Sequence, residues 1–173
     1  VTAIQYVNAT GTMLAVGRVI GGRRENRLNA LPSLLSVYDG VPSSATETHL
    51  ICRFDVDLDS PVSCIARTEK RVVYAGLENG TLLKLDLRAY TGIGSAPARQ
   101  FVSIPLSPLV TAIAVSACGR FVAVGTDFGD YGGVLLYDAD LKPLAMFDTS
   151  SEPYALAFHQ PWMPDDPPPP TLF

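Results

Sequence analysis

The sequence is poor in the residues that carry most enzyme chemistry. It has two histidines, His49 and His159, far apart in the chain, and three cysteines, Cys52, Cys64 and Cys118, without a CxxC pair. It contains no Gly-x-Ser-x-Gly motif, no phosphate-binding loop and no HExxH motif. We therefore predict no catalytic residues, no metal site and no cofactor, and we expect the protein not to be an enzyme.

The cysteines also bear on the cellular compartment. An odd and scattered set is typical of buried, small apolar residues in a reducing environment. We therefore predict an intracellular protein, without distinguishing cytoplasm from nucleus.

Charged residues are scarce as well, at 17% of the 173 residues, whereas apolar residues make up 47%. This balance excludes disorder, because the chain has enough apolar material for a buried core. The 14 glycines and 14 prolines favour short strands and tight turns over long helices. Residues 100–119 carry no charge and are long enough to cross a bilayer, but two prolines and several Ser and Thr side chains interrupt them. We therefore predict no membrane span.

The net charge of −4 is unevenly distributed. Residues 127–173 contain eight acidic side chains and the single basic residue Lys142, so the earlier part of the chain is slightly basic. The acidic balance argues weakly against a dedicated nucleic-acid binder, because such proteins rely on Lys and Arg contacts to phosphate.

Four stretches of the chain share an alternating pattern, at residues 1–4, 62–65, 110–113 and 153–156. Each alternates apolar residues with small or polar ones, which is typical of a β-strand. After the first three, a turn leads to an apolar run that ends in Gly17, Gly76 or Gly125. A third segment then ends in Tyr38-Asp39, Leu85-Asp86 or Tyr137-Asp138, and a fourth covers residues 48–56, 99–106 or 141–148. The predicted unit is four short strands joined by turns, repeated three times and begun a fourth time.

This unit resembles the WD-repeat family of β-propellers. The resemblance lies in the turn followed by an apolar run ending in glycine, in the Asn79-Gly80-Thr81 turn, and in the Tyr-Asp and Leu-Asp pairs where the family places Trp-Asp. It implies an all-β fold of about three four-stranded blades plus the start of a fourth. We expect the repeats at about residues 1–60, 61–108 and 109–151, with the fourth starting at about 152–173. Because propellers usually close with four to eight blades, we predict a partial propeller whose further blades come from the same or another chain.

Function is expected where the chain departs from the repeat. The first such place is the loop after Gly17, which carries Arg18, Arg23, Arg24 and Arg27. The resemblance places this loop on the face that usually receives partners, and arginine suits carboxylate or phosphate. The two interpretations are a solvated variable loop and a partner-binding site.

The corresponding loop of the third repeat, residues 127–133, is acidic, aromatic and rich in glycine. It is either a shaped turn with an exposed tyrosine or a partner contact through Asp130 and Tyr131. Asp55, Asp57 and Asp59 lie on one face of a predicted strand, where carboxylates resist unwanted edge pairing; their spacing fits a calcium loop poorly. Pro167–Pro170 are interpreted as a long turn between two strands or, alternatively, as a docking motif.

From these observations we predict a non-catalytic scaffold for protein–protein contacts, a WD-repeat-like subunit of an intracellular multiprotein complex. The alternative is a propeller subunit of a ribonucleoprotein or other nucleic-acid-associated complex, contacting phosphate through the loop from Arg18 to Arg27.

Overall fold

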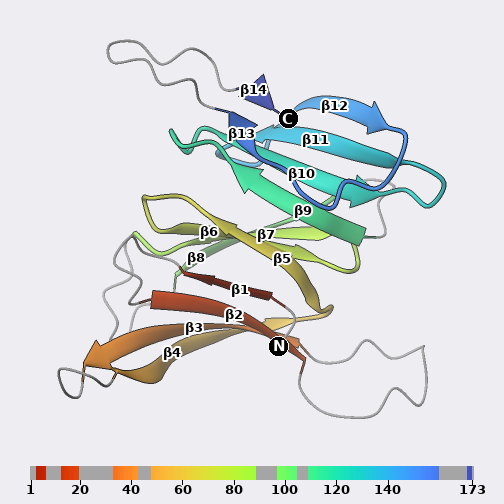
Figure 1. The fold of residues 1–173 in the computed structure, drawn as a ribbon. Coiled ribbons are helices and arrows are strands. Elements are labelled where there is room, and N and C mark those ends of the chain that lie inside the picture. The colour runs from red at the N-terminus through yellow and green to blue at the C-terminus, as the bar shows by residue number, and fades with distance from the viewer. Residues whose placement is uncertain are drawn as a thin grey trace, which may run out of the picture.

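A computed structural model describes residues 3–6, 13–19, 33–42, 48–88, 97–104, 109–159 and 171–172. These residues form three antiparallel sheets of four strands and one pair of short strands (Figure 1). The all-β architecture of three four-stranded units and the start of a fourth is therefore confirmed. The strands of the first sheet are β1 (Ala3–Tyr6), β2 (Met13–Val19), β3 (Ser33–Pro42) and β4 (Thr48–Leu58). Those of the second are β5 (Val62–Arg67), β6 (Val72–Leu77), β7 (Thr81–Asp86) and β8 (Ala98–Ser103). The third sheet contains β9 (Leu109–Val115), β10 (Phe121–Asp127), β11 (Gly132–Asp138) and β12 (Pro143–Thr149), and the short pair is β13 (Phe158–His159) with β14 (Thr171–Leu172).

The three sheets follow one another as successive layers, with the second between the first and the third (Figure 1). Within each sheet the strands lie in chain order, so every connection is a turn between antiparallel neighbours. Between sheets, the first strands are neighbours: β5 contacts both β1 and β9. The first strands therefore form the inner edge of the arc.

Most of the core lies in the two seams between sheets, and a third, smaller cluster of Ala114, Ala123 and Val134 packs against Leu156 and Phe158. Alternate residues of the second sheet face opposite ways, as expected for pleated strands. Val73, Leu83 and Leu85 are fully buried against the first sheet. Tyr74 and Leu82 are almost as fully buried in the seam with the third sheet. The second sheet is thus covered on both faces, which explains why β6 is buried along its whole length.

The glycine near the end of the second strand has a packing role in the second and third repeats. A Cβ on Gly76 would lie 2.3 Å from Cγ1 of Val110, and one on Gly125 would lie 2.9 Å from Cγ of Pro153. Val110 and Pro153 hold equivalent positions at the starts of two successive repeats. Each glycine therefore makes room for the residue with which the next repeat begins.

We call the space that each glycine leaves for the first residue of the next repeat a socket. A hydroxyl group forms a hydrogen bond at each of these sockets. The Ser63 hydroxyl donates to the backbone carbonyl oxygen of Val110 (2.5 Å), and the carbonyl oxygen of Gly76 lies 3.0 Å from the same hydroxyl. The Thr111 hydroxyl, one repeat later, donates to the carbonyl oxygen of Pro153 (2.6 Å). Ser63 and Thr111 are equivalent residues, so the alternation in the first strands encodes a link between neighbouring repeats as well as a strand.

Side chains at the outer end of the second seam hold a turn of the third sheet. The Lys84 ammonium group and the Tyr74 hydroxyl both donate to the carbonyl oxygen of Ala139, and the Gln100 side-chain amide donates to that of Asp140 (3.0 Å). Burial, with a smaller contribution from the negative charge of Asp140, raises the pKa of Tyr74 to about 12. Tyr74 therefore stays a neutral donor in this seam.

The aspartates that end the third strands of the second and third sheets shape the following turns. Oδ1 of Asp86 accepts a hydrogen bond from the backbone N–H of Arg88 (3.0 Å). Oδ1 of Asp138 accepts two, from the N–H groups of Asp140 and Lys142 (2.9 Å each). The predicted turn at Asn79 is confirmed, with Gly80 at a φ of 79°. Asp86 and Asp138 are thus turn-forming residues, whereas Asp39, their counterpart in the first repeat, lies inside β3.

Two expectations are wrong. Residues 153–156 are not a strand: among the described residues of the fourth unit, the strands are β13 and β14, which pair with each other. Proline has no N–H to donate to a ladder, and the carbonyl of Pro153 is already bound to Thr111. The cysteines are not all buried either, because Cys52 and Cys118 are exposed and Cys64 is half-buried. Cys52 lies on the outward face of β4 and Cys118 lies in a turn.

Other predictions meet the structure only in part. Pro167–Pro170 lie outside the described residues, although the strands on either side of them pair with each other. No helix long and apolar enough to cross a membrane occurs in the part of the chain that the structure describes.

Candidate functional site

The acidic loop between β10 and β11 is a turn held by its own hydrogen bonds. The backbone N–H of Phe128 donates to the carbonyl oxygen of Tyr131 (3.0 Å), and Oδ1 of Asp127 accepts from the N–H of Gly129 (2.7 Å). Gly129 has a φ of 94°, which a residue with a side chain rarely adopts. These hydrogen bonds fix the conformation of the loop, and the glycine at position 129 allows it.

The loop presents an aromatic side chain next to a carboxylate. The rings of Phe128 and Tyr131 stack with their centroids 5.2 Å apart. Phe128 itself packs closely on Gly133, where an added Cβ would lie 2.4 Å from the Phe128 ring. Tyr131 is 47% exposed and Asp130 is also exposed. An anchored aromatic residue that stays accessible costs little entropy when it binds a partner.

Arg18 lies in strand β2 and its charge is paired, so it is not a free cation of the loop. Its guanidinium donates to the Ser36 hydroxyl (2.7 Å) and lies 3.3 Å from Oδ1 of Asp55, which also accepts a hydrogen bond from Ser36. The guanidinium also lies over the Tyr38 ring, 5.8 Å from its centroid. All four residues lie on the face of the first sheet that points away from the second sheet. Arg18 thus has its charge balanced within the sheet, and Arg23, Arg24 and Arg27 lie outside the described residues.

The acidic residues at the end of β4 and directly after it have separate contacts. Asp55 belongs to the network with Arg18, whereas Oδ1 of Asp59 accepts a hydrogen bond from the Asn79 side-chain amide (3.1 Å). Asp57 is exposed, and Val56 and Leu58 between the acidic residues are buried. Among the described residues, no group of three His, Cys, Asp or Glu side chains is arranged to hold a metal ion.

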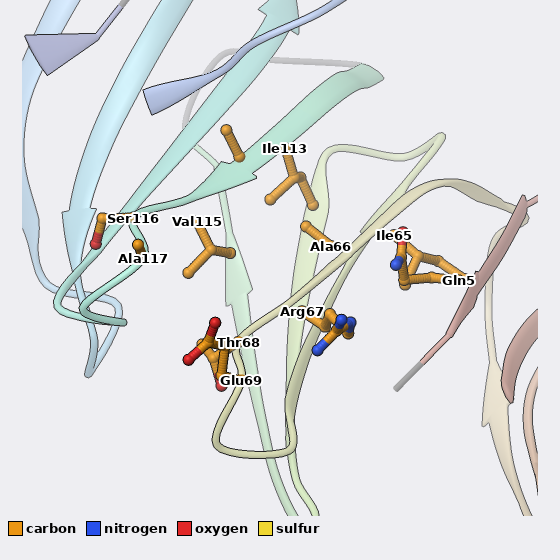
Figure 2. Close-up of a pocket in the computed structure, with 11 residues that line it drawn as sticks. Gln5, Ile65, Ala66, Arg67, Thr68, Glu69, Ile113, Val115, Ser116 and Ala117 are labelled. Atoms are coloured by element: carbon orange, nitrogen blue, oxygen red, sulfur yellow. The ribbon is translucent and has the colours of Figure 1, made fainter. Parts of the chain in front are cut away.

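An open pocket of about 370 Å³ lies at the inner edge of the arc (Figure 2). Its residues come from the first strands of all three sheets: Gln5 of β1, residues 65–69 of β5 and its turn, and residues 113–117 of β9 and its turn. The turns in this set precede β6 and β10, whereas the acidic loop follows β10. The pocket and the acidic loop therefore lie toward opposite ends of the strands. Sequence analysis did not predict this pocket.

The two turns at the pocket are built alike. The hydroxyl oxygen of Thr68 accepts from the N–H of Val72 (3.2 Å), and that of Ser116 accepts from the N–H of Phe121 (3.0 Å). The second turn also contains Cys118, whose thiol lies 3.4 Å from the Ser116 hydroxyl. Partial burial acts to raise the pKa of Cys118, but hydrogen bonds from Ser116 and Arg120 and the charge of Arg120 outweigh it and lower the pKa to about 7.

Three stacked four-stranded antiparallel sheets that meet along their first strands define an arc of a β-propeller. Solved structures with this architecture include the β-propeller domain of Cps50 (Swd1) from Myceliophteria thermophila, with a TM-score of 0.63 at 14% identity. Sqt1 of Saccharomyces cerevisiae matches with a TM-score of 0.55 and a chain of the COPII outer coat vertex with 0.58, each at 17% identity. These are WD-repeat β-propellers, and the chain has the fold of part of one.

The matches cover 90%, 83% and 86% of this chain but 46%, 41% and 39% of the solved ones, in the same order. The chain thus spans less than half the length of each of these structures. At such identities the similarity shows the fold alone. No family model matches the sequence, and no curated protein matches it.

Proposed function

We propose that the protein is a non-catalytic platform for protein–protein contacts and a subunit of a multiprotein complex. The observation that carries this proposal is one repeated framework bearing connections of unequal length and chemistry. Between the second and third strands, the second sheet has the short turn 78–80, the third has the aromatic and acidic residues 128–131, and the first has residues 20–32. A constant scaffold with variable loops is the usual basis of recognition by repeat proteins.

The structural neighbours support this role by analogy. One is described as part of the outer coat vertex of COPII on membranes, which is a protein assembly. Propellers host many functions, so the argument for this chain rests on its loops. We also propose an intracellular compartment, which now rests only on the odd and scattered set of cysteines.

We assign the contact first to Asp130 and Tyr131. Tyrosine is enriched at the centres of interfaces, and Tyr131 is held by its stack on Phe128. Arg18, Arg23, Arg24 and Arg27 stay proposed as a second contact. The ion pair of Arg18 with Asp55 leaves less charge for phosphate, which favours a protein partner over the nucleic-acid alternative.

Affinity purification of the full chain from cell extract, compared quantitatively between variants, tests this proposal. Tyr131→Ala removes the presented ring and is expected to lower retention of specific partners by about tenfold. Phe101→Ala is the matched control, because Phe101 is 51% exposed but lies on β8, away from the loop.

Partners that depend on Tyr131 and resist nuclease support the platform. Identical protein sets for all variants would contradict the site, and the absence of any retained protein would contradict the function. Loss of retention after nuclease treatment would favour the nucleic-acid alternative.

A further inference from the structure

Two residues of the inner strands break the repeat, and both line the same pocket. At the fifth position of the four repeats stand Gln5, Ala66, Ala114 and Ala157, and at the sixth stand Tyr6, Arg67, Val115 and Phe158. Small and apolar residues are thus the rule, and Gln5 and Arg67 are the polar exceptions. Both belong to the pocket at the inner edge of the arc. Departures that meet in space from separate repeats indicate a shared role.

The strand register directs both side chains into one space. Gln5 pairs with Ala15 and Arg67 pairs with Val73. Ala15 and Val73 belong to the apolar cluster between the first and second sheets. Because directly opposed residues in antiparallel strands share a face, Gln5 and Arg67 point toward each other's sheet. Figure 2 shows both on the same side of β5, beside Ile65.

Arg67 is a half-buried cation without a balancing charge. Within the described part of the chain its guanidinium has no hydrogen-bond or ion-pair partner, whereas Arg18 and Arg88 each have an acidic one. The nearby Glu69 is exposed and forms no ion pair with it. Withdrawing an ionised group from water without a partner is unfavourable. The site is therefore arranged to gain stability when an anion arrives.

The walls of the pocket select among anions. Ile65, on the same side of β5, supplies apolar surface beside the guanidinium, whereas Ile113 and Val115 line the pocket from the other side of that strand. A carboxylate on a short aliphatic stem satisfies both parts, because the arginine fork binds a carboxylate through two parallel hydrogen bonds and the stem can pack on Ile65.

We infer that this pocket binds the carboxylate of an acidic side chain, a glutamate, from a partner protein. The inference rests on the proposed function, since it names the chemistry of one partner contact. It adds a further contact surface, at the opposite end of the strands from Asp130 and Tyr131.

The test is an NMR titration of the full ¹⁵N-labelled chain with N-acetyl-glutamate N-methylamide. The matched ligand is N-acetyl-glutamine N-methylamide, which has the same shape without the charge, and inorganic phosphate is the third probe. We expect the glutamate probe to shift the Arg67 Nε–H signal and the amide signals of β5 and β9, with an affinity at least about tenfold above that of the glutamine probe. Equal affinities would overturn the inference, and tighter binding of phosphate would assign the site to phosphate instead.

Three variants test whether binding of the glutamate probe depends on Arg67. Arg67→Leu is expected to fold, because other repeats carry an apolar residue at this position, and to lower the affinity about tenfold or more. Arg99→Leu removes an exposed arginine of β8 outside the pocket and is expected to change nothing. Glu69→Gln removes a like charge at the rim and is expected to tighten binding. Unchanged affinity in Arg67→Leu would overturn the inference.

The pocket inference and the proposed function can be contradicted independently of each other. If Arg67→Leu abolishes binding of the glutamate probe but the chain retains no proteins from extract, the pocket stands and the proposed function falls. If the chain retains partners that depend on Tyr131 but never binds the glutamate probe, the proposed function stands and the pocket inference falls.

Discussion

Replacing Gly76 with alanine tests the packing between repeats. The new Cβ would lie 2.3 Å from Cγ1 of Val110 and 2.9 Å from Sγ of Cys64. Val110 is fully buried and β-branched, so it has no free rotamer to adopt. We expect Gly76→Ala to lower the free energy of unfolding by about 2–3 kcal/mol, the upper part of the range for overpacking. Urea denaturation followed by circular dichroism measures this change.

A double-mutant cycle separates the clash from other effects of the new methyl group. Val110→Ala alone removes buried methyl groups and is expected to cost about 2 kcal/mol. It also removes the atom nearest to the new Cβ, so the double variant should be more stable than the sum of the two changes predicts, by about 1 kcal/mol. Some clash stays, because Cβ of Val110 would lie 2.7 Å away.

Gly125→Ala is the graded control. Its nearest contact is Cγ of Pro153 at 2.9 Å, the tip of a ring in a segment outside the regular strands, so we expect a smaller cost than at Gly76. Strict additivity in the cycle, or a Gly76→Ala variant as stable as the original protein, would refute the socket.

Two further predictions concern hydroxyl and thiol groups. Thr111→Val removes the donor to the Pro153 carbonyl and is expected to lower the free energy of unfolding by about 1 kcal/mol. Thr111→Ser keeps a hydroxyl and is expected to retain most of this stability. Equal stability of the two variants in urea would contradict the hydrogen bond between repeats. In a Cys52→Ser background, alkylation of Cys118 by iodoacetamide is expected to reach half its maximal rate near pH 7, because the lowered pKa makes the thiolate abundant above that pH. Arg120→Gln should move this midpoint upward, and unfolding in urea should move it to about 8.5; a midpoint shared by native and unfolded protein would contradict the assignment.

The repeated framework could be predicted from the sequence because the patterns that mark it, such as alternation along a strand, are local. Alternation predicted β5 and β9, and the Leu85-Asp86 pair marked the end of β7. The recurring glycine was visible too, but its reason was not. Only the structure shows that Gly76 faces Val110 from another repeat.

The failures arise where long-range contacts decide. Residues 153–156 have a strand pattern, but Pro153 is held through its carbonyl by Thr111. Arg18 appeared to belong to a solvated loop, whereas Asp55, far along the chain, balances it. Gln5 and Arg67 were within reach, since extending the comparison of the first strands by two residues would have shown both as exceptions.

The burial of both faces of the second sheet means that the arc does not loosen uniformly. β6 and β7 have a neighbouring layer on either side, whereas the first and third sheets each meet only one other four-stranded sheet within the described residues. Local opening events should therefore start in the outer layers and reach the middle one last, as in a short stack whose units are stabilised only by their immediate neighbours.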